Sequence, residues 1–220
     1  MIQPELFSQR VSGSQIQVPH LQTVFTIGFG GLDARTFFEL LKNAGVTALI
    51  DTRRSPSGPR ARFADGRDLP YLCDLHNIAY SHNIELAPTR ESRNRLKVVE
   101  GDKKRNQDDR AEAWTRFLEG YVGQISQTKV LRPGSDLRSV VESAHERVAI
   151  ACACAYHMDC HRRAAAGLIQ YWVKGVDVIH LSRESLGLAK VSPKSPRRYQ
   201  IRGIERAMLK TNPPGKRTSR

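Results

Sequence analysis

The most constraining feature of the sequence is a strand, a glycine turn, a helix and a second strand in immediate succession. Residues 21–27 form an apolar and β-branched run, and residues 28–31 contain three glycines. The stretch 33–44 has apolar residues at helical spacing, begins with an aspartate suited to cap a helix, and is followed by Gly45, which is suited to end one. Residues 46–50 are almost entirely apolar, as in a strand buried on both faces. This βαβ pattern predicts two parallel strands and an α/β fold.

The rest of the chain continues the alternation of helices and strands. We expect helices at 69–76, 111–125, 136–145 and 160–173, and strands at 78–82, 148–152 and 176–181. The polar stretch 83–109 has few periodic apolar residues and is expected to be a long loop. Together these elements predict an open, mostly parallel sheet with helices on both faces.

The expected organisation is one α/β domain with an appendage at each end. The domain spans residues 21–181, after an N-terminal extension at 1–20 and before a basic C-terminal tail at 182–220. The first twenty residues lack the basic and apolar regions of a secretory signal. No run approaches the roughly 18 apolar residues that a membrane span requires. We therefore expect a cytoplasmic protein with no membrane partner.

The chain is strongly basic, with 35 Lys and Arg against 22 Asp and Glu and a net charge of +13. From Lys190 onward there are ten basic residues and one acidic residue. This imbalance favours polyanionic partners, and nucleic acid is the first candidate. The charge does not choose between DNA and RNA, and a basic surface without any partner is the alternative.

The chemistry-bearing residues follow the strands directly. Ligands of open parallel sheets bind beyond the carboxyl ends of the strands. Four predicted strands end there in residues 28–31, Asp51-Thr52-Arg53-Arg54, His82, and the segment from Cys152 to Arg162. We therefore expect Gly28, Asp51, His82 and Cys160 to lie in one cleft.

These motifs carry a resemblance to a known family. They are Thr26-Ile27-Gly28, Asp51-Thr52-Arg53-Arg54 followed by a proline and a basic loop with Phe63, and a Cys-x7-Cys-His-Arg run from Cys152 to Arg162. In order and spacing they resemble the domain of unknown function 488 family, over residues 24–181. The resemblance implies the fold of that family and leaves the chemistry to be argued from the residues.

The first candidate group lies after the second strand. Asp51 and Arg53 are two residues apart in an extended segment, so their side chains point to the same side while that of Arg54 points away. Asp51 is a candidate catalytic residue, and an internal salt bridge that fixes the loop is the alternative. Gly28, Arg53, Arg54, His82 and Arg162 are candidate substrate-binding residues, because guanidinium groups bind phosphates and other anions well.

The second candidate group begins at the helix expected from Cys160. A thiol at a helix N-terminus is stabilised as the thiolate, which makes Cys160 a candidate nucleophile beside the candidate catalytic residue His161. Cys152 and Cys154 are expected to be buried core cysteines. A zinc site from these residues is an alternative, but their spacing is unlike the usual paired zinc ligands. We expect no metal and no cofactor.

Three function classes follow. The first is a nucleic-acid-associated protein, with or without enzymatic activity in this cleft, whose loop and tail supply phosphate contacts. The second is a small-molecule enzyme that uses Cys160 as a thiol nucleophile or redox centre on an anionic substrate. The third is a non-catalytic binding module.

Overall fold

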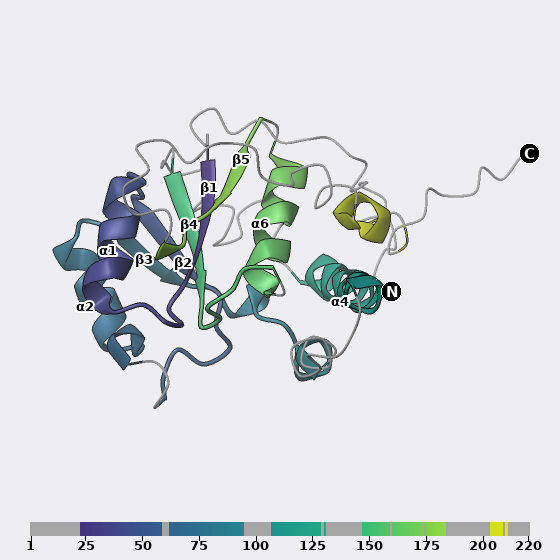
Figure 1. Ribbon diagram of the computed structural model, residues 1–220, viewed down its shortest axis with the longest axis horizontal. Helices are drawn as coiled ribbons and strands as arrows, with labels where there is room; N and C mark the ends of the chain where they lie inside the picture. The colour runs from purple at the N-terminus through teal and green to yellow at the C-terminus, as the bar shows by residue number, and fades with distance from the viewer. Residues whose placement is uncertain are drawn as a thin grey trace, which may run out of the picture.

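The strands form one all-parallel sheet in the order β3-β2-β4-β1-β5 (Figure 1). A computed structural model describes residues 23–58, 62–94, 107–128, 130, 147–158, 160–173, 175–183, 203–208 and 210. The strands are β1 (Thr23–Gly28), β2 (Ala48–Asp51), β3 (Ala79–His82), β4 (Arg147–Cys152) and β5 (Asp177–His180). The predicted α/β class with a parallel sheet is confirmed.

Helices cover both faces of the sheet, as predicted (Figure 1). The α-helices are α1 (Ala34–Asn43), α2 (Asp68–Leu75), α4 (Gln107–Gln127) and α6 (His161–Trp172), and short 3-10 helices are η2 (Arg62–Ala64) and η3 (Ile84–Leu86). The expected ends of the first helix are confirmed, because the Asp33 side chain accepts the Thr36 N–H and Gly45 has a positive φ of 64°.

One of the sequence expectations needs correction, and two others lie outside these ranges. The stretch 83–109 is not all loop, since it contains η3 and the first residues of α4. The first turn of α4 has the sequence QDDR, which has no apolar spacing to reveal a helix. The helix expected at 136–145 and the extension 1–20 fall outside the described residues.

The apolar strands divide their side chains between two cores. Phe25, Leu49 and Ala149 belong to the core under α1 and α2. Their neighbours Val24, Ile50 and Ile150 belong to the core under α4 and α6. Successive strand residues point to opposite faces, so strands covered by helices on both sides must be apolar throughout.

The strand order creates a switch point at the centre of the sheet. The chain moves from β1 to β2 in one direction across the sheet and from β4 to β5 in the other. Because crossovers between parallel strands share one hand, α1 and α6 lie on opposite faces. The connections that follow the adjacent strands β1 and β4 therefore part from each other, and the crevice at such a point is where ligands bind in this class of fold.

Part of the expected basic tail packs on the domain. Residues 203–208 are helical, and Ile204, Ala207 and Met208 are buried in the same core as α4 and α6 (Figure 1). Among the helices that the structure describes, none combines the length and the apolarity needed to cross a membrane.

Candidate functional site

The carboxyl ends of the strands are level across the sheet. In the strand register, Asp51 is paired with both His82 and Ala151, and Gly28 is paired with Cys152. The residues expected at this edge are therefore all there. Cys160 and Arg162 join them from the start of α6, where Cys160 is the N-cap residue.

The same alternation that builds the two cores puts these residues on opposite faces of the sheet. Leu49 belongs to the core under α1 and α2, so Asp51 points to that face. Ile150 belongs to the core under α4 and α6, so Cys152 points to the other. The expectation that Asp51 and the Cys160 group share one cleft is therefore wrong, because the two groups share an edge but not a face.

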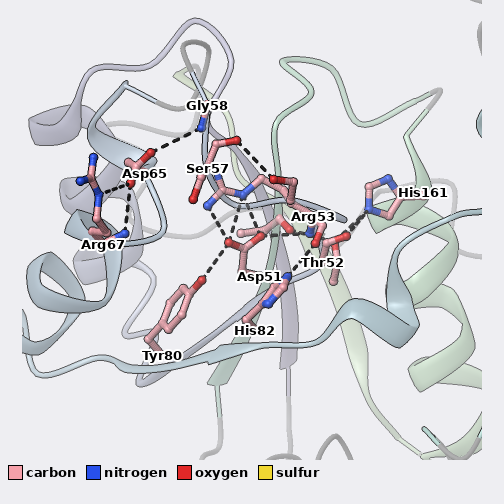
Figure 2. Close-up of polar contacts among 12 residues, drawn as sticks. Asp51, Thr52, Arg53, Ser57, Gly58, Asp65, Arg67, Tyr80, His82 and His161 are labelled. Carbon is pink, nitrogen blue, oxygen red and sulfur yellow. Dashed lines mark hydrogen bonds and ion pairs between the residues drawn. The ribbon is translucent and has the colours of Figure 1, made fainter.

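The Asp51 carboxylate is buried and surrounded by donors (Figure 2). Arg53 donates to it through Nε, at 2.9 and 3.0 Å from its two oxygens, and through Nη2 at 2.6 Å. The backbone N–H of Arg53 and the hydroxyl of Tyr80 donate to it as well, both at 3.0 Å. This saturation supports the loop-fixing role for Asp51 over a catalytic one.

The remaining residues of this group complete the loop anchor. The Arg53 guanidinium lies over the Phe29 ring, 4.5 Å from its centroid. The exposed His82 binds the Arg53 carbonyl through Nε2 at 2.7 Å, and since a carbonyl only accepts, this nitrogen is the donor. Arg54 points away and is exposed, as its place in the sequence predicted.

On the other face, three groups converge on the sulfur of Cys152. The Cys160 sulfur lies 2.9 Å from it, the Cys154 backbone N–H donates to it at 3.2 Å, and Arg162 Nη1 donates to it at 3.1 Å. The Cys160 sulfur is farther from Arg162 Nη1, at 3.6 Å. Cys152 and Cys160 are both fully buried.

Arg162 is a buried cation whose nearest ionisable partners, among the described residues, are cysteine sulfurs. Its side chain is 1 % exposed, and it donates to the carbonyls of Cys154 and Ala155 at 2.6 and 3.2 Å. Within the described residues it makes no ion pair with a carboxylate, and its Nε has no hydrogen-bond partner. A buried charge without a partner is strongly unfavourable. A thiolate on Cys152 would supply the negative charge that offsets the Arg162 guanidinium.

The start of α6 adds positive potential to this place. Its first turn holds His161, Arg162 and Arg163 and has no acidic residue, the reverse of what the helix dipole favours. Arg163 is also buried, with its guanidinium over the Trp114 ring and Nη1 bonded to the Met158 carbonyl. An anion beside this turn offsets the unfavourable arrangement.

The pKa values of the two thiols are shifted in opposite directions. Burial alone raises the pKa of Cys152, but hydrogen bonds from Cys154 and Cys160 and the charge of Arg162 lower it well below its usual range. Burial and the neighbouring Cys152 raise the pKa of Cys160 well above the usual range of a thiol. The pair shares one negative charge, and the shorter contact with Arg162 assigns it to Cys152 rather than to Cys160.

The tautomer of His161 follows from its contacts with Thr52 (Figure 2). His161 Nε2 lies 2.9 Å from the Thr52 hydroxyl and 3.1 Å from the Thr52 carbonyl. The hydroxyl itself donates to the Ala151 carbonyl at 2.8 Å, so Nε2 carries the proton. Burial lowers the pKa of His161, which keeps the ring neutral. Its unprotonated Nδ1 lies 3.9 Å from the Cys160 sulfur.

Gly28 allows the loop after β4 to fold over the end of β1. A Cβ atom on Gly28 would lie 1.8 Å from the Cys154 carbonyl oxygen and 2.6 Å from Arg162 Nη1. The neighbours of Gly28 in the structure are therefore the site residues themselves, which explains the need for glycine here.

The same residues offer a donor set for a soft metal ion. Ligand atoms of Cys152, Cys160 and His161 lie within 4.8 Å of one another. Two thiolates bound to tetrahedral zinc at about 2.3 Å would be roughly 3.8 Å apart, whereas the two sulfurs are 2.9 Å apart. The Arg162 guanidinium also directs positive charge at them. The arrangement fits an anion stabilised by arginine better than a cation site.

The sequence did not single out two of the residues that matter here. Cys152 was expected to be a core cysteine, yet as the last residue of a strand it faces the helix that begins at Cys160. In the sequence, Thr52 stands out only as a member of the motif Asp51-Thr52-Arg53-Arg54. The signal available in the sequence was Arg162, which follows Cys160 by two residues and so brings a cation close to the thiols.

Comparison with family models matches residues 33–169, more than half of the chain, to a family described as Domain of unknown function DUF488. Searches of curated proteins and of solved structures gave no significant match.

Proposed function

The chain belongs to the DUF488 family, and from that premise we propose that it is a thiol-dependent enzyme whose nucleophile is the Cys152 thiolate. The observation that carries the proposal is the buried Arg162 guanidinium, 3.1 Å from the Cys152 sulfur and without a carboxylate partner among the described residues. Thiolates, not thiols, are the nucleophiles of cysteine enzymes.

The position of the thiol supports the same conclusion. Cys152 ends the central strand β4, beside Gly28 on one side and Thr52 on the other. This is the switch point of the sheet, where ligands of this fold class bind. The substrate class is a small electrophile, and the basic first turn of α6 favours substrates that carry negative charge.

The ultraviolet absorbance of the thiolate, followed against pH, tests the proposal. The wild-type protein should show one thiolate that forms well below the ordinary thiol pKa of about 8.5. C152S should abolish this transition, and C160A should keep it at a higher pH because one donor to the sulfur is lost. C73S is the matched control, since burial raises the pKa of Cys73 to about 12 and it lies in the other core. A transition near the ordinary thiol pKa, or a transition that is lost in C160A and kept in C152S, would contradict the proposal.

Nucleic-acid association is a second candidate function, supported by a separate observation. The loop after β2 presents Arg54, Arg62 and Arg67 to solvent, on a chain with a net charge of +13. Exposed arginines of this kind bind phosphates. The two candidates concern different surfaces and are compatible with each other.

A further inference from the structure

We propose that Cys152 and Cys160 form a reversible dithiol–disulfide pair that reduces a small hydroperoxide. The inference rests on the proposed Cys152 thiolate and adds to it a substrate class and a second reacting sulfur. It follows from three observations on the face of the sheet covered by α6: the distance between the two sulfurs, the placement of His161, and the burial of Arg162.

The sulfurs are already close to bonding distance. They are 2.9 Å apart, and a disulfide bond of about 2.05 Å requires an approach of roughly 0.9 Å. Cys152 lies at the end of a strand and Cys160 at the cap of a helix, so the movement involves two side chains and the segment between them. No rearrangement of the sheet is needed.

The first step belongs to Cys152. Its thiolate attacks one oxygen of the hydroperoxide, the O–O bond breaks, and the departing oxygen leaves as hydroxide or alkoxide and takes up a proton. Cys152 becomes a sulfenic acid. Because both sulfurs are fully buried, the oxidant that reaches them must be small, and hydrogen peroxide is the simplest member of the class.

The second step belongs to Cys160 and His161. The neutral His161 has its free Nδ1 toward the Cys160 sulfur, 3.9 Å away, and accepts the thiol proton. Cys160 then attacks the Cys152 sulfur, the S–O bond breaks, and hydroxide leaves as water with the proton from His161. The overall reaction is two thiols and one peroxide giving one disulfide and two waters, or one water and an alcohol.

Arg162 makes the disulfide easy to reduce again. In the reduced protein the guanidinium faces a thiolate at 3.1 Å. Oxidation removes that negative charge and leaves a buried cation without a partner. A disulfide whose reduced form is stabilised in this way is a strong oxidant, so a thiol small enough to reach it, such as 2-mercaptoethanol, should restore the dithiol.

The test is oxidation of the reduced, full-length protein with one equivalent of hydrogen peroxide, followed by peptide mass mapping. The expected product is a single disulfide between Cys152 and Cys160. C160S should instead accumulate a sulfenic acid on Cys152, trapped by a dimedone probe, and C152S should show neither product. C73S should behave as wild type. A disulfide that includes Cys154, or a sulfenic acid that persists in the wild type, would overturn the pair.

Two further variants separate the roles of the neighbours. H161A should form the sulfenic acid at the wild-type rate but convert it to the disulfide at least about tenfold more slowly. The rate of this second step should rise again with pH, because the Cys160 thiol then ionises without a base. R162Q, or R162M where the glutamine variant fails to fold, should shift the equilibrium with 2-mercaptoethanol at least about tenfold toward the disulfide. Equal effects of H161A on both steps, or an unchanged equilibrium in both Arg162 variants, would contradict these roles.

The outcomes distinguish this inference from the proposed function. A thiolate that titrates low in the absorbance experiment, together with no Cys152–Cys160 disulfide, removes the redox pair and leaves the nucleophile. The absence of a low-titrating thiolate removes both.

Discussion

At the scale of single residues, two of the buried arginines, Arg53 and Arg162, are neutralised in different ways. Arg53 is paired with a carboxylate, Asp51, in a bidentate ion pair inside the loop after β2. Arg162 is hydrogen-bonded to sulfur and carbonyl groups instead. The first pair is complete within itself and holds structure, whereas the second depends on the ionisation of a thiol and is open to chemistry.

We expect D51N to destabilise the protein by about 3–5 kcal/mol, because it leaves the buried Arg53 without its counter-charge. Urea unfolding at neutral pH measures the change. Y80F, which removes only one donor to the same carboxylate, should cost about 1 kcal/mol. D65N, in a pair with a largely exposed arginine, is the control and should have a much smaller effect than D51N. Equal losses for D51N and D65N would contradict the structural role of the buried pair.

The Cys152 thiolate should also leave a signature in the pH dependence of stability. Its pKa is lowered in the folded protein, so the unfolded chain binds more protons between that lowered value and about 8.5. The stability that the thiolate contributes is therefore fully present above about 8.5 and is lost as pH falls through the lowered pKa. The difference in unfolding free energy between wild type and C152S should grow with pH across this window. A difference that is flat with pH would contradict the thiolate.

At the scale of elements, the site depends on a close crossing of two loops. The connection after β4 passes over the end of β1, where Gly28 and Gly30 leave no room for side chains. This crossing brings the Cys154 carbonyl and the Arg162 guanidinium together. The glycine turn after β1 thus acts on the cysteine site through packing.

G28A should therefore weaken both the fold and the site. Its Cβ would clash with a backbone oxygen at 1.8 Å, and overpacking of this kind costs about 1–3 kcal/mol or more. The displaced loop should also raise the pH at which the Cys152 thiolate forms. G31A is the control: Gly31 has a φ of 76° and nothing within 4 Å of its added Cβ, so it should strain the turn and leave the thiolate titration unchanged. Thermal unfolding and thiolate absorbance report the two effects separately.

At the scale of the whole molecule, charge rather than fold argues for a polyanionic partner. The described residues place Arg54, Arg62 and Arg67 in one exposed loop, while the segment 203–208 of the basic tail is partly buried. A surface that neutralises about five or six phosphates should lose affinity for duplex DNA with a log–log salt slope of roughly −4 to −5.

Replacing these three arginines by glutamine should make that slope shallower by up to about 2.7. Filter binding at several salt concentrations measures it. The matched control replaces Lys42, Arg116 and Arg206, three exposed cations on other elements, and should have a smaller effect on the slope. No binding at low salt would exclude the nucleic-acid candidate and leave the thiol enzyme.

The sequence allowed the fold to be predicted because its signals are local. Apolar strands, a capping aspartate and a terminating glycine each act within a few residues. The faces of the site were not predictable in the same way. Asp51 and Cys152 both end buried strands, and only the strand register shows that one points toward α1 and the other toward α6. The choice of Cys152 over Cys160 as the thiolate also depends on distances to Arg162, which no spacing in the sequence reveals.

The strand order has a consequence for the protein during its synthesis. β4 lies between β2 and β1, so β1 finds its first neighbour, β4, only after residues 147–152 have emerged from the ribosome. Until then both edges of β1 lack their strand partners, while β2 and β3 can already pair. Such distant pairing slows folding and exposes aggregation-prone edges. The nascent chain should therefore be most prone to aggregation between the synthesis of β1 and that of β4.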